Sequence, residues 1–358
     1  MVEGAVGIAM MNSTALASTT VVTVTAASGA SSNNRFYSNT INGGNYGIVL
    51  RGFAATTPFT LADTNNDIGG LSLTTGNTIL NFGGAAAAAN PSAGIRIVDQ
   101  WSANASFNTI NNNNGSGVNH VSTLRGIITS GGTSASLNIN NNIISVQSGA
   151  TTSQLDAISN GAGSTAASNT ININNNSVAI GYPNVAAAGN TINGIINSST
   201  ANTVNINSNT VSQIPAVNLA GTGTWIMIEG GSPGGTLNTN NNIVSNIVRT
   251  GASGSFRGVK AATPVGLWTC TGNLVENISY STVASTGSID GVFDANSATL
   301  INISSNIIRN LSTPTTGTIN GIRINTITGT HTCNNNQVYN FSTTAGGVGG
   351  ATFAGISF

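Results

Sequence analysis

The stretch LNINNNIISV, residues 137–146, carries two conflicting signals. Its asparagine triplet, Asn140 to Asn142, is typical of low-complexity, disordered sequence. The flanking Leu137, Ile139 and Ile144 instead follow the alternation of a strand with one buried face. The architecture of the whole chain depends on which of these two signals is correct.

The composition of the 358-residue chain favours an ordered, β-rich protein. Only 9 residues are Lys or Arg and 9 are Asp or Glu, so the net charge is zero, and 39% of residues are hydrophobic. Disordered chains combine low hydrophobicity with high net charge. Abundant Asn, Gly, Thr, Ser, Ile and Val are typical of strands and turns. Neutrality argues against nucleic-acid partners, and no apolar run is long enough to predict membrane insertion.

The opening stretch recurs along the chain. Aligned on one asparagine, it matches fragments such as INSNTV at Asn209 and ISSNII at Asn306. From the first copy to the last there are 297 residues in nine steps, a mean spacing of 33. The ten aligned asparagines are Asn39, Asn77, Asn108, Asn142, Asn176, Asn209, Asn242, Asn273, Asn306 and Asn336.

Each copy predicts short strands. An alternating apolar pair precedes most of the asparagines, and an apolar residue follows two positions after each one. Some 15 to 20 residues later, most copies contain a second strand that is expected to open in Gly-Ile or Gly-Val, as in GIIN at 194. Such a unit cannot bury its own apolar face and must stack on its neighbours. Helical repeats of this length need amphipathic helices, which this composition does not favour, so the sequence predicts an all-β, right-handed parallel β-helix of about ten coils.

The asparagines are expected to form ladders in this solenoid. Asn tolerates the left-handed backbone of a sharp corner, and stacked amides donate to one neighbouring coil and accept from the other. A second ladder is predicted four residues after the first, at Asn246, Asn277, Asn310 and Asn340. The opening stretch is therefore interpreted as an ordered corner.

Two long fragments resemble a known group of proteins. NGIRINTITGTHTCNNNQVYNFST (320–343) and GTLNTNNNIVSNIVRTG (235–251) are similar to the right-handed parallel β-helix repeats of large secreted surface proteins of Bacteroidetes-like bacteria, in the pectate-lyase-like superfamily. The resemblance covers residues 33–358 and leaves 1–32 as an N-terminal strand leading into the repeats. It implies an extracellular or cell-surface location. The superfamily includes lyases, glycosidases, adhesins and fibre proteins.

The few charges are predicted to tie neighbouring coils together. By register, Arg125 is followed one coil later by Asp156, Arg257 by Asp290, and Glu276 by Arg309. Asp99, Glu229 and Asp294 fall in different coils or columns and are expected to be isolated. Glycosidases need two carboxyl groups roughly 5–10 Å apart, so the chain is expected to have no catalytic residues and no cofactor.

Residues 61–70, LADTNNDIGG, contain a candidate metal site. Asp63, Asn65 and Asp67 alternate as at the start of a calcium loop, but Ile68 stands where that motif has glycine and no Glu closes it. A polar surface loop without metal is the favoured alternative.

The two cysteines are predicted to be free thiols in the core. Cys270 and Cys333 each lie three residues before a ladder asparagine, where other coils carry Ile. Ile303 lies between them, which predicts a Cα separation of about 9–10 Å, beyond the ~7 Å limit of a disulfide. The three tryptophans form no stripe and are expected in the core or at a coil edge.

The function expected from these observations is structural: a segment of an extracellular surface fibre or adhesin. The final fragment, ATFAGISF, matches a Gly-Ile strand and shows no evident cap. Exposed coil ends template further strands, so self-association into head-to-tail filaments is expected, with surface glycans as further partners. The alternative is a secreted glycan-binding or glycan-cleaving β-helix, similar to a polysaccharide lyase or glycoside hydrolase.

Overall fold

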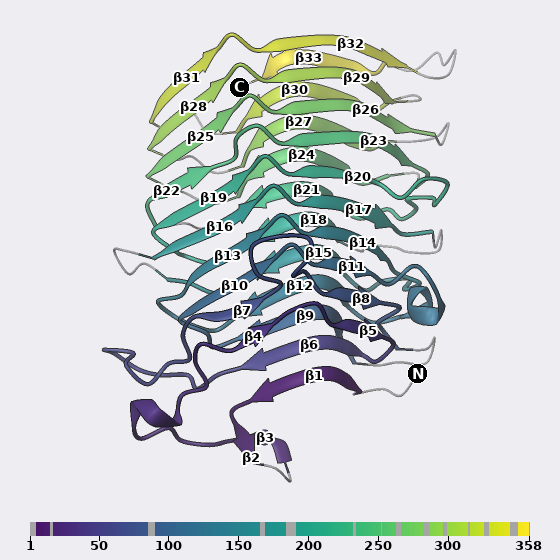
Figure 1. Ribbon diagram of the computed structural model, residues 1–358. Helices are drawn as coiled ribbons and strands as arrows, with labels where there is room; N and C mark the ends of the chain where they lie inside the picture. Colours follow the sequence, from purple (N-terminus) through teal and green to yellow (C-terminus); the bar gives the residue numbers. More distant parts are fainter. Residues whose placement is uncertain are drawn as a thin grey trace.

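The computed structural model consists of stacked parallel strands (Figure 1). It describes residues 5–14, 17–84, 90–164, 169–183, 191–231, 234–251, 253–262, 266–281, 286–295, 299–313, 316–325, 329–343 and 350–357. Three long parallel sheets run along this part of the chain. The all-β parallel solenoid predicted from the repeat is confirmed.

Sheet I, as we call the eleven-stranded sheet, contains the Gly-Ile segments. Its strands, in spatial order, are β1 (Val6–Met11), β6 (Tyr46–Arg51), β9 (Ser92–Val98), β12 (Leu124–Ser130), β15 (Leu155–Asn160), β18 (Ile192–Asn197), β21 (Trp225–Gly230), β24 (Ser255–Ala261), β27 (Ser288–Asp294), β30 (Thr318–Ile324) and β33 (Thr352–Ser357).

Sheets II and III, with ten described strands each, lie on either side of the ladder asparagines. Sheet II contains β4 (Arg35–Phe36), β7 (Asn66–Ile68), β10 (Ser102–Ser106), β13 (Ser136–Asn140), β16 (Thr170–Asn174), β19 (Thr203–Asn207), β22 (Thr236–Asn238), β25 (Leu267–Thr271), β28 (Leu300–Ser304) and β31 (Thr330–Asn334). Sheet III contains β5 (Thr40–Asn42), β8 (Thr78–Leu80), β11 (Thr109–Asn111), β14 (Ile143–Gln147), β17 (Ser177–Gly181), β20 (Thr210–Gln213), β23 (Ile243–Arg249), β26 (Leu274–Tyr280), β29 (Ile307–Thr313) and β32 (Gln337–Thr343).

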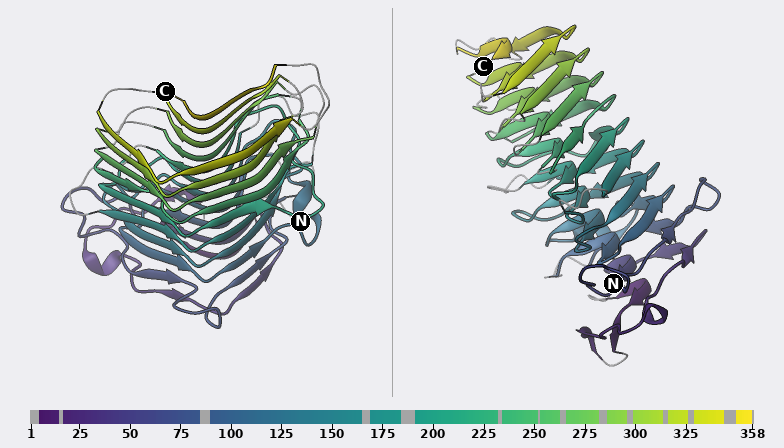
Figure 2. Two further views of the ribbon diagram at one scale, coloured as in Figure 1. Left: turned by 90° about the horizontal axis from the view of Figure 1, so that it is seen from above. Right: turned by 90° about the vertical axis from the view of Figure 1, so that its left-hand side faces the viewer.

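Equivalent residues of successive coils stack in columns, because the period of the sequence matches one coil. Ile139 pairs in register with Ile173, which pairs with Ile206, and all three are fully buried. Seen from above, the coils lie on one another around this apolar interior (Figure 2). Alternate residues of each strand therefore form a continuous core, which supplies the burial that a single repeat lacks.

Most glycines of the Gly-Ile segments are required by close packing against the next coil and against sheet III, and Gly355, with open space around it, is an exception. A Cβ atom added at Gly47 would lie 2.5 Å from the Gly94 carbonyl oxygen and 2.5 Å from Ile79 Cγ2. The expectation that these strands open at the glycine is wrong, because β9 begins at Ser92 and β18 at Ile192, two residues earlier. The glycine lies inside the strand, at the point where a side chain would meet sheet III.

The segment 1–32 contributes a strand to the solenoid. β1 pairs in parallel with β6 and so belongs to sheet I. It is followed by an antiparallel hairpin, β2 (Ser13–Thr14) and β3 (Ala17–Val21), and by the short 3₁₀ helix η1 (Ala27–Gly29). A second 3₁₀ helix, η2, spans Ser116–Asn119. Within the described ranges, no helix has the length and apolarity needed to cross a membrane.

Candidate functional site

The first asparagine ladder forms an unbroken chain of side-chain amides at the bend between sheets II and III. Asn142 Nδ2 donates to Asn176 Oδ1 over 2.9 Å and to the Ala105 carbonyl over 2.8 Å. Its Oδ1 accepts bonds from the backbone N and from the Nδ2 of Asn108. All nine steps of the ladder, from Asn39 to Asn336, carry the same amide bond, with N···O distances of 2.9–3.1 Å. Buried amides thus have every polar group paired.

Of the two reasons expected for asparagine at this position, the left-handed backbone is wrong. The left-handed backbone belongs to the preceding residue, with φ of 57° at Asn141 and at Ser208. In nine of the ten coils this preceding residue has positive φ, and Gly76 is the exception. The other expected reason, the amide ladder, is confirmed, because eight of the ten ladder asparagines are buried and their amides pair with neighbouring coils.

The second ladder differs from the first in exposure and backbone. Asn277 Nδ2 donates to Asn246 Oδ1 at 3.1 Å, Asn310 to Asn277 at 2.9 Å, and Asn340 to Asn310 at 3.1 Å. These amides are exposed and donate toward the earlier coil, whereas those of the first ladder donate toward the later one. All four residues have φ between 55° and 58°, so here asparagine itself adopts the left-handed conformation.

Two further asparagine stacks were missed by the sequence reasoning. The outward residues Asn138, Asn172, Asn205 and Asn238 are joined by amide bonds of 2.8–2.9 Å. In the neighbouring column, the Asn140 side chain accepts the backbone N–H of Asn174, and this contact repeats in the next coils. The alternating Asn-Ile-Asn pattern of these coils was the available signal.

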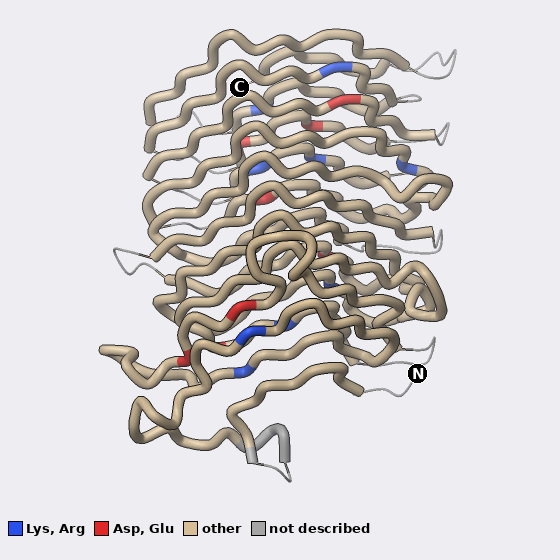
Figure 3. Tube along the Cα trace, in the orientation of Figure 1, with Lys and Arg blue, Asp and Glu red and all other residues tan. Residues whose placement is uncertain are grey.

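The three predicted charge pairs are brought together on adjacent coils. Arg125 Nε lies 3.1 Å from Asp156 Oδ2, and Arg257 Nε lies 3.8 Å from Asp290 Oδ2. In the third pair, Arg309 Nη2 lies 2.7 Å from Glu276 Oε2. Charged residues are sparse along the rest of the solenoid (Figure 3).

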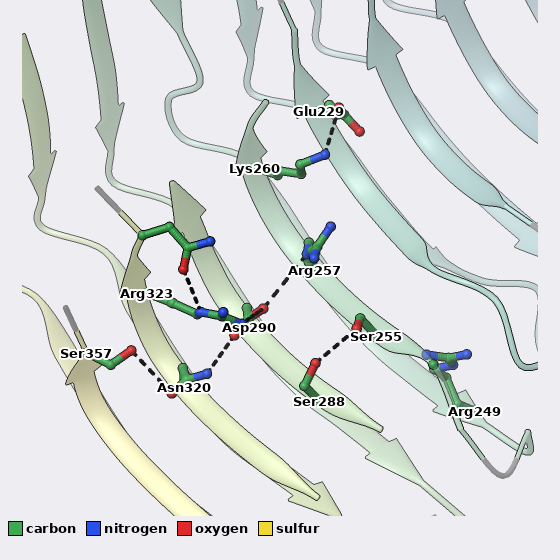
Figure 4. A network of polar contacts seen from close by, with 12 residues as sticks. Glu229, Arg249, Ser255, Arg257, Lys260, Ser288, Asp290, Asn320, Arg323 and Ser357 are labelled. Carbon is green, nitrogen blue, oxygen red and sulfur yellow. Dashed lines mark hydrogen bonds and ion pairs between the residues drawn. The ribbon is translucent and has the colours of Figure 1, made fainter. Parts of the chain in front are cut away.

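Glu229 was expected to be isolated, and this is wrong. Lys260 Nζ donates to Glu229 Oε1 over 2.9 Å, because the two residues are partners in register on β21 and β24. Figure 4 shows this pair beside a larger network on sheet I. There Asp290 Oδ2 also lies 3.7 Å from Arg323 Nη1, a second cation that the sequence reasoning did not assign.

The carboxyl group of Asp290 is fully buried beneath its two arginines. Asn320 Nδ2 donates to Asp290 Oδ1 over 2.7 Å, while Oδ2 has no hydrogen bond. Burial raises the pKa of Asp290, against the lowering effects of Asn320 and the two arginines. The Arg257 and Arg323 guanidinium groups both lie over the Phe293 ring, at 4.4 and 5.0 Å from its centroid.

The candidate calcium loop places its carboxylates apart. Asp63 is buried and accepts the backbone N–H of Ser31 at 2.9 Å, and burial raises the pKa of its carboxyl group. Asp67 accepts bonds from Tyr37 and from Asn104. Asn65 donates to Asn33 on the neighbouring coil. In the described part of the chain, no three His, Cys, Asp or Glu side chains converge as metal ligands would.

The interior of the solenoid contains a buried arginine, Arg249. Arg249 lies between the rings of Trp225 and Tyr280, with its Cζ 4.3 and 4.8 Å from their centroids. Its Nη1 donates to Tyr280 Oη over 2.7 Å, and its Nη2 donates to the carbonyls of Gly221, Gly223 and Ser253. Burial lowers the pKa of Arg249. This cation fixes two turns against the sheet, a role that its position in the sequence did not indicate.

Both cysteines are free, and they lie in one column. Cys270 pairs in register with Ile303, which pairs with Cys333, so one coil separates them. Cys270 is fully buried, and Cys333 is partly buried against the core. Trp225 and Trp268 are buried in the core, and Trp101 is half-buried beside Phe59.

The last described coil leaves the core columns uncovered. β31, β32 and β33 each stand at the end of their sheet, with a hydrogen-bonded neighbour on one side only. Phe353 and Ile356 pair in register with Ile319 and Ile322, which are fully buried. Phe353 and Ile356 are themselves 44% and 43% exposed. Within the described residues, no further coil covers these apolar side chains and strand edges.

No known protein family, characterised protein or solved structure matches this chain.

Proposed function

We propose that this chain is a structural and interaction segment of an extracellular bacterial surface fibre or adhesin, and that it assembles end to end. The observation that carries the proposal is the continuous parallel stack, whose outer strands β31, β32 and β33 can each pair with one further coil. The resemblance of residues 235–251 and 320–343 to repeats of large secreted surface proteins supports the location. The sparse, internally paired charges support a structural role.

The occupant proposed for this end is a second copy of the same chain. Phe353 and Ile356 continue columns that every earlier coil covers with another coil. A parallel coil with the same spacing satisfies both the strand edges and these apolar columns. At the opposite end of the solenoid, β1, β4 and β5 are the outer strands of the three sheets, and each has its sheet neighbour on one side only.

Contact between these two different ends gives an open assembly. Because the surfaces are not identical, the interface is head-to-tail, and repetition produces a filament rather than a closed two-fold dimer. Light scattering of the purified chain is expected to show a mass that rises with concentration, and electron micrographs are expected to show rods of variable length.

A matched pair of substitutions tests the interface. Ile356→Lys places a charge in the uncovered core column, whereas Ile143→Lys places one on a similarly exposed side chain of β14 in the middle of the solenoid. We expect I356K to remain monomeric and I143K to assemble as the unmodified chain does, with circular dichroism showing equal β content. Concentration-independent monomers of the unmodified chain contradict the proposal, as does equal assembly of both variants.

The proposed role is not catalytic. Three carboxylates on sheet I, Asp156, Glu229 and Asp290, are each paired with a cation of a neighbouring coil. Such pairing leaves none of these three free to act as a general acid or base. Purified protein is expected to release no reducing ends or unsaturated products from pectin or alginate. Turnover that disappears in D156N or D290N favours the alternative, a glycan-cleaving β-helix.

A further inference from the structure

The sequence contains five Asn-Gly dipeptides, and the fold places them in different surroundings. Asparagine followed by glycine readily loses its side-chain amide, because glycine has no Cβ atom to keep its backbone nitrogen away from the Asn Cγ. The reaction requires an asparagine side chain that can turn and a glycine nitrogen that can reach it. The five asparagines are Asn42, Asn114, Asn160, Asn193 and Asn320.

Three of these asparagines are buried, and their amides are held by the neighbouring coils. The amide nitrogens of Asn193 and Asn320 donate over 2.7 Å to carboxylates of the preceding coil, those of Asp156 and Asp290. The amide of Asn160 donates to the side-chain oxygen on the following coil over 2.6 Å. None of these three side chains can turn toward the next backbone nitrogen unless the bonds between coils break.

Asn42 is exposed, but the glycine nitrogen that follows it is occupied. Asn42 ends strand β5, and the Gly43 N–H donates to the Leu80 carbonyl over 3.0 Å. This bond joins β5 to β8 in sheet III. The Gly43 nitrogen is therefore fixed by the sheet and is not available to attack the neighbouring side chain.

Asn114 differs from the other four, because both its side chain and the nitrogen of Gly115 are free. The two residues lie in the turn between β11 and η2, and both are exposed. Within the described part of the chain, neither the Asn114 amide nor the Gly115 N–H has a hydrogen-bond partner. Glycine is required here, since a Cβ atom at Gly115 would lie 2.6 Å from Asn81 Cγ. Asn81 is itself held in place, because its Oδ1 accepts the Gly117 N–H over 2.7 Å.

We propose that Asn114 is a site of spontaneous deamidation. The Gly115 nitrogen loses its proton and bonds to Asn114 Cγ, and the Cγ–Nδ2 bond breaks with release of ammonia. Water then opens the cyclic imide at either of its carbonyl groups, which gives aspartate or isoaspartate. The net reaction consumes one water, releases one ammonia and adds a negative charge to a chain whose formal net charge is zero. Because the reaction needs no enzyme and is irreversible, the modified fraction increases with the age of the protein.

Peptide mapping by mass spectrometry tests the site in the folded, full-length chain. Incubation in mildly alkaline water enriched in heavy oxygen labels each reacted asparagine, because one oxygen of the product comes from the solvent. We expect Asn114 to react at least about tenfold faster than the other four, which need a local opening of the fold first. In denaturant the five rates should become similar. Equal rates at Asn114 and Asn42 in the folded chain overturn the proposal, as does a preference for Asn114 that persists unchanged in denaturant.

A matched pair of variants locates the new charge. Asn114→Gln keeps the amide but adds a methylene group, so the backbone nitrogen would have to close a larger and less favourable ring. Asn42→Gln is the control, because Asn42 is the other exposed asparagine of the set. After long incubation, isoelectric focusing should show a more acidic species for the unmodified chain and for N42Q, and none for N114Q, with equal circular dichroism spectra before incubation. An acidic species of N114Q that forms as fast as that of N42Q overturns the assignment to Asn114.

Discussion

Asn176 Nδ2 donates to Asn209 Oδ1 across 2.9 Å, although 33 residues separate them along the chain. The same oxygen accepts the backbone N–H of Asn176, so one side chain serves two donors of the previous coil. Asn209 in turn donates to Asn242 and to the Ile173 carbonyl. A single asparagine therefore connects three successive coils.

Replacing Asn209 with Leu is expected to destabilise the fold strongly. The change leaves both donors of Asn176 and the Ile173 carbonyl without partners in a buried bend, at a cost of about 3 kcal/mol or more. Ser208→Asn is the matched neighbour, since Ser208 is exposed with φ of 57°, which Asn tolerates. S208N should change the free energy of unfolding by less than about 0.5 kcal/mol. Chemical denaturation measures both, and equal losses contradict the role of the buried amide.

At the second ladder, the stability of the fold is expected to depend more on backbone conformation than on the side-chain amide. Asn277 is exposed and has φ of 56°. Asn277→Gly keeps that conformation free of strain and should cost less than about 1 kcal/mol, whereas the β-branched Asn277→Val should cost about 2 kcal/mol. Denaturation midpoints compare the two variants. A Gly variant as unstable as the Val variant shows that the amide bonds dominate here too.

The two thiols are expected to stay reduced and to differ in reactivity. Burial raises the pKa of Cys270 to about 12 and also raises that of the partly buried Cys333. Since the thiolate is the reactive species, iodoacetamide at pH 8 should modify Cys333 faster than Cys270 in the folded protein. Both should react in denaturant. Mass spectrometry without reductant checks the pairing, and a loss of two hydrogens contradicts the register.

Asp290 is expected to make the fold less stable as pH rises. Its pKa is raised above the ordinary value of 3.8, so the folded state binds this proton more tightly than the unfolded state. The contribution to stability is then full below pH 3.8 and is lost as pH rises through the raised pKa. Asp290→Asn should therefore gain stability relative to the unmodified chain between about pH 4 and neutrality. Urea denaturation across this pH range measures the difference in free energy of unfolding between D290N and the unmodified chain. If this difference shrinks as pH rises, the prediction is wrong.

The sequence by itself determined the solenoid and its columns, because a period near 33 residues repeats every contact once per coil. Asn142 and Asn176, or Arg125 and Asp156, occupy equivalent positions of neighbouring repeats, and stacking must bring such positions together. The buried status of Cys270 followed from the Ile that occupies its place in other coils. The solenoid, its columns and the burial of Cys270 could be predicted because they depend only on the spacing of the repeat and on the alternation of apolar and polar residues.

Only the tertiary structure decided the features that depend on where the chain goes between the regular positions. The turns between sheets differ in length from coil to coil, so no spacing indicates that Arg249 meets the carbonyls of Gly221 and Gly223. By contrast, spacing could have indicated Lys260 as the partner of Glu229, because it lies 31 residues later in the same column. In nine of the ten bends, the left-handed residue lies one position before the ladder asparagine, because backbone torsion is set by how the two flanking strands pack and not by the repeat.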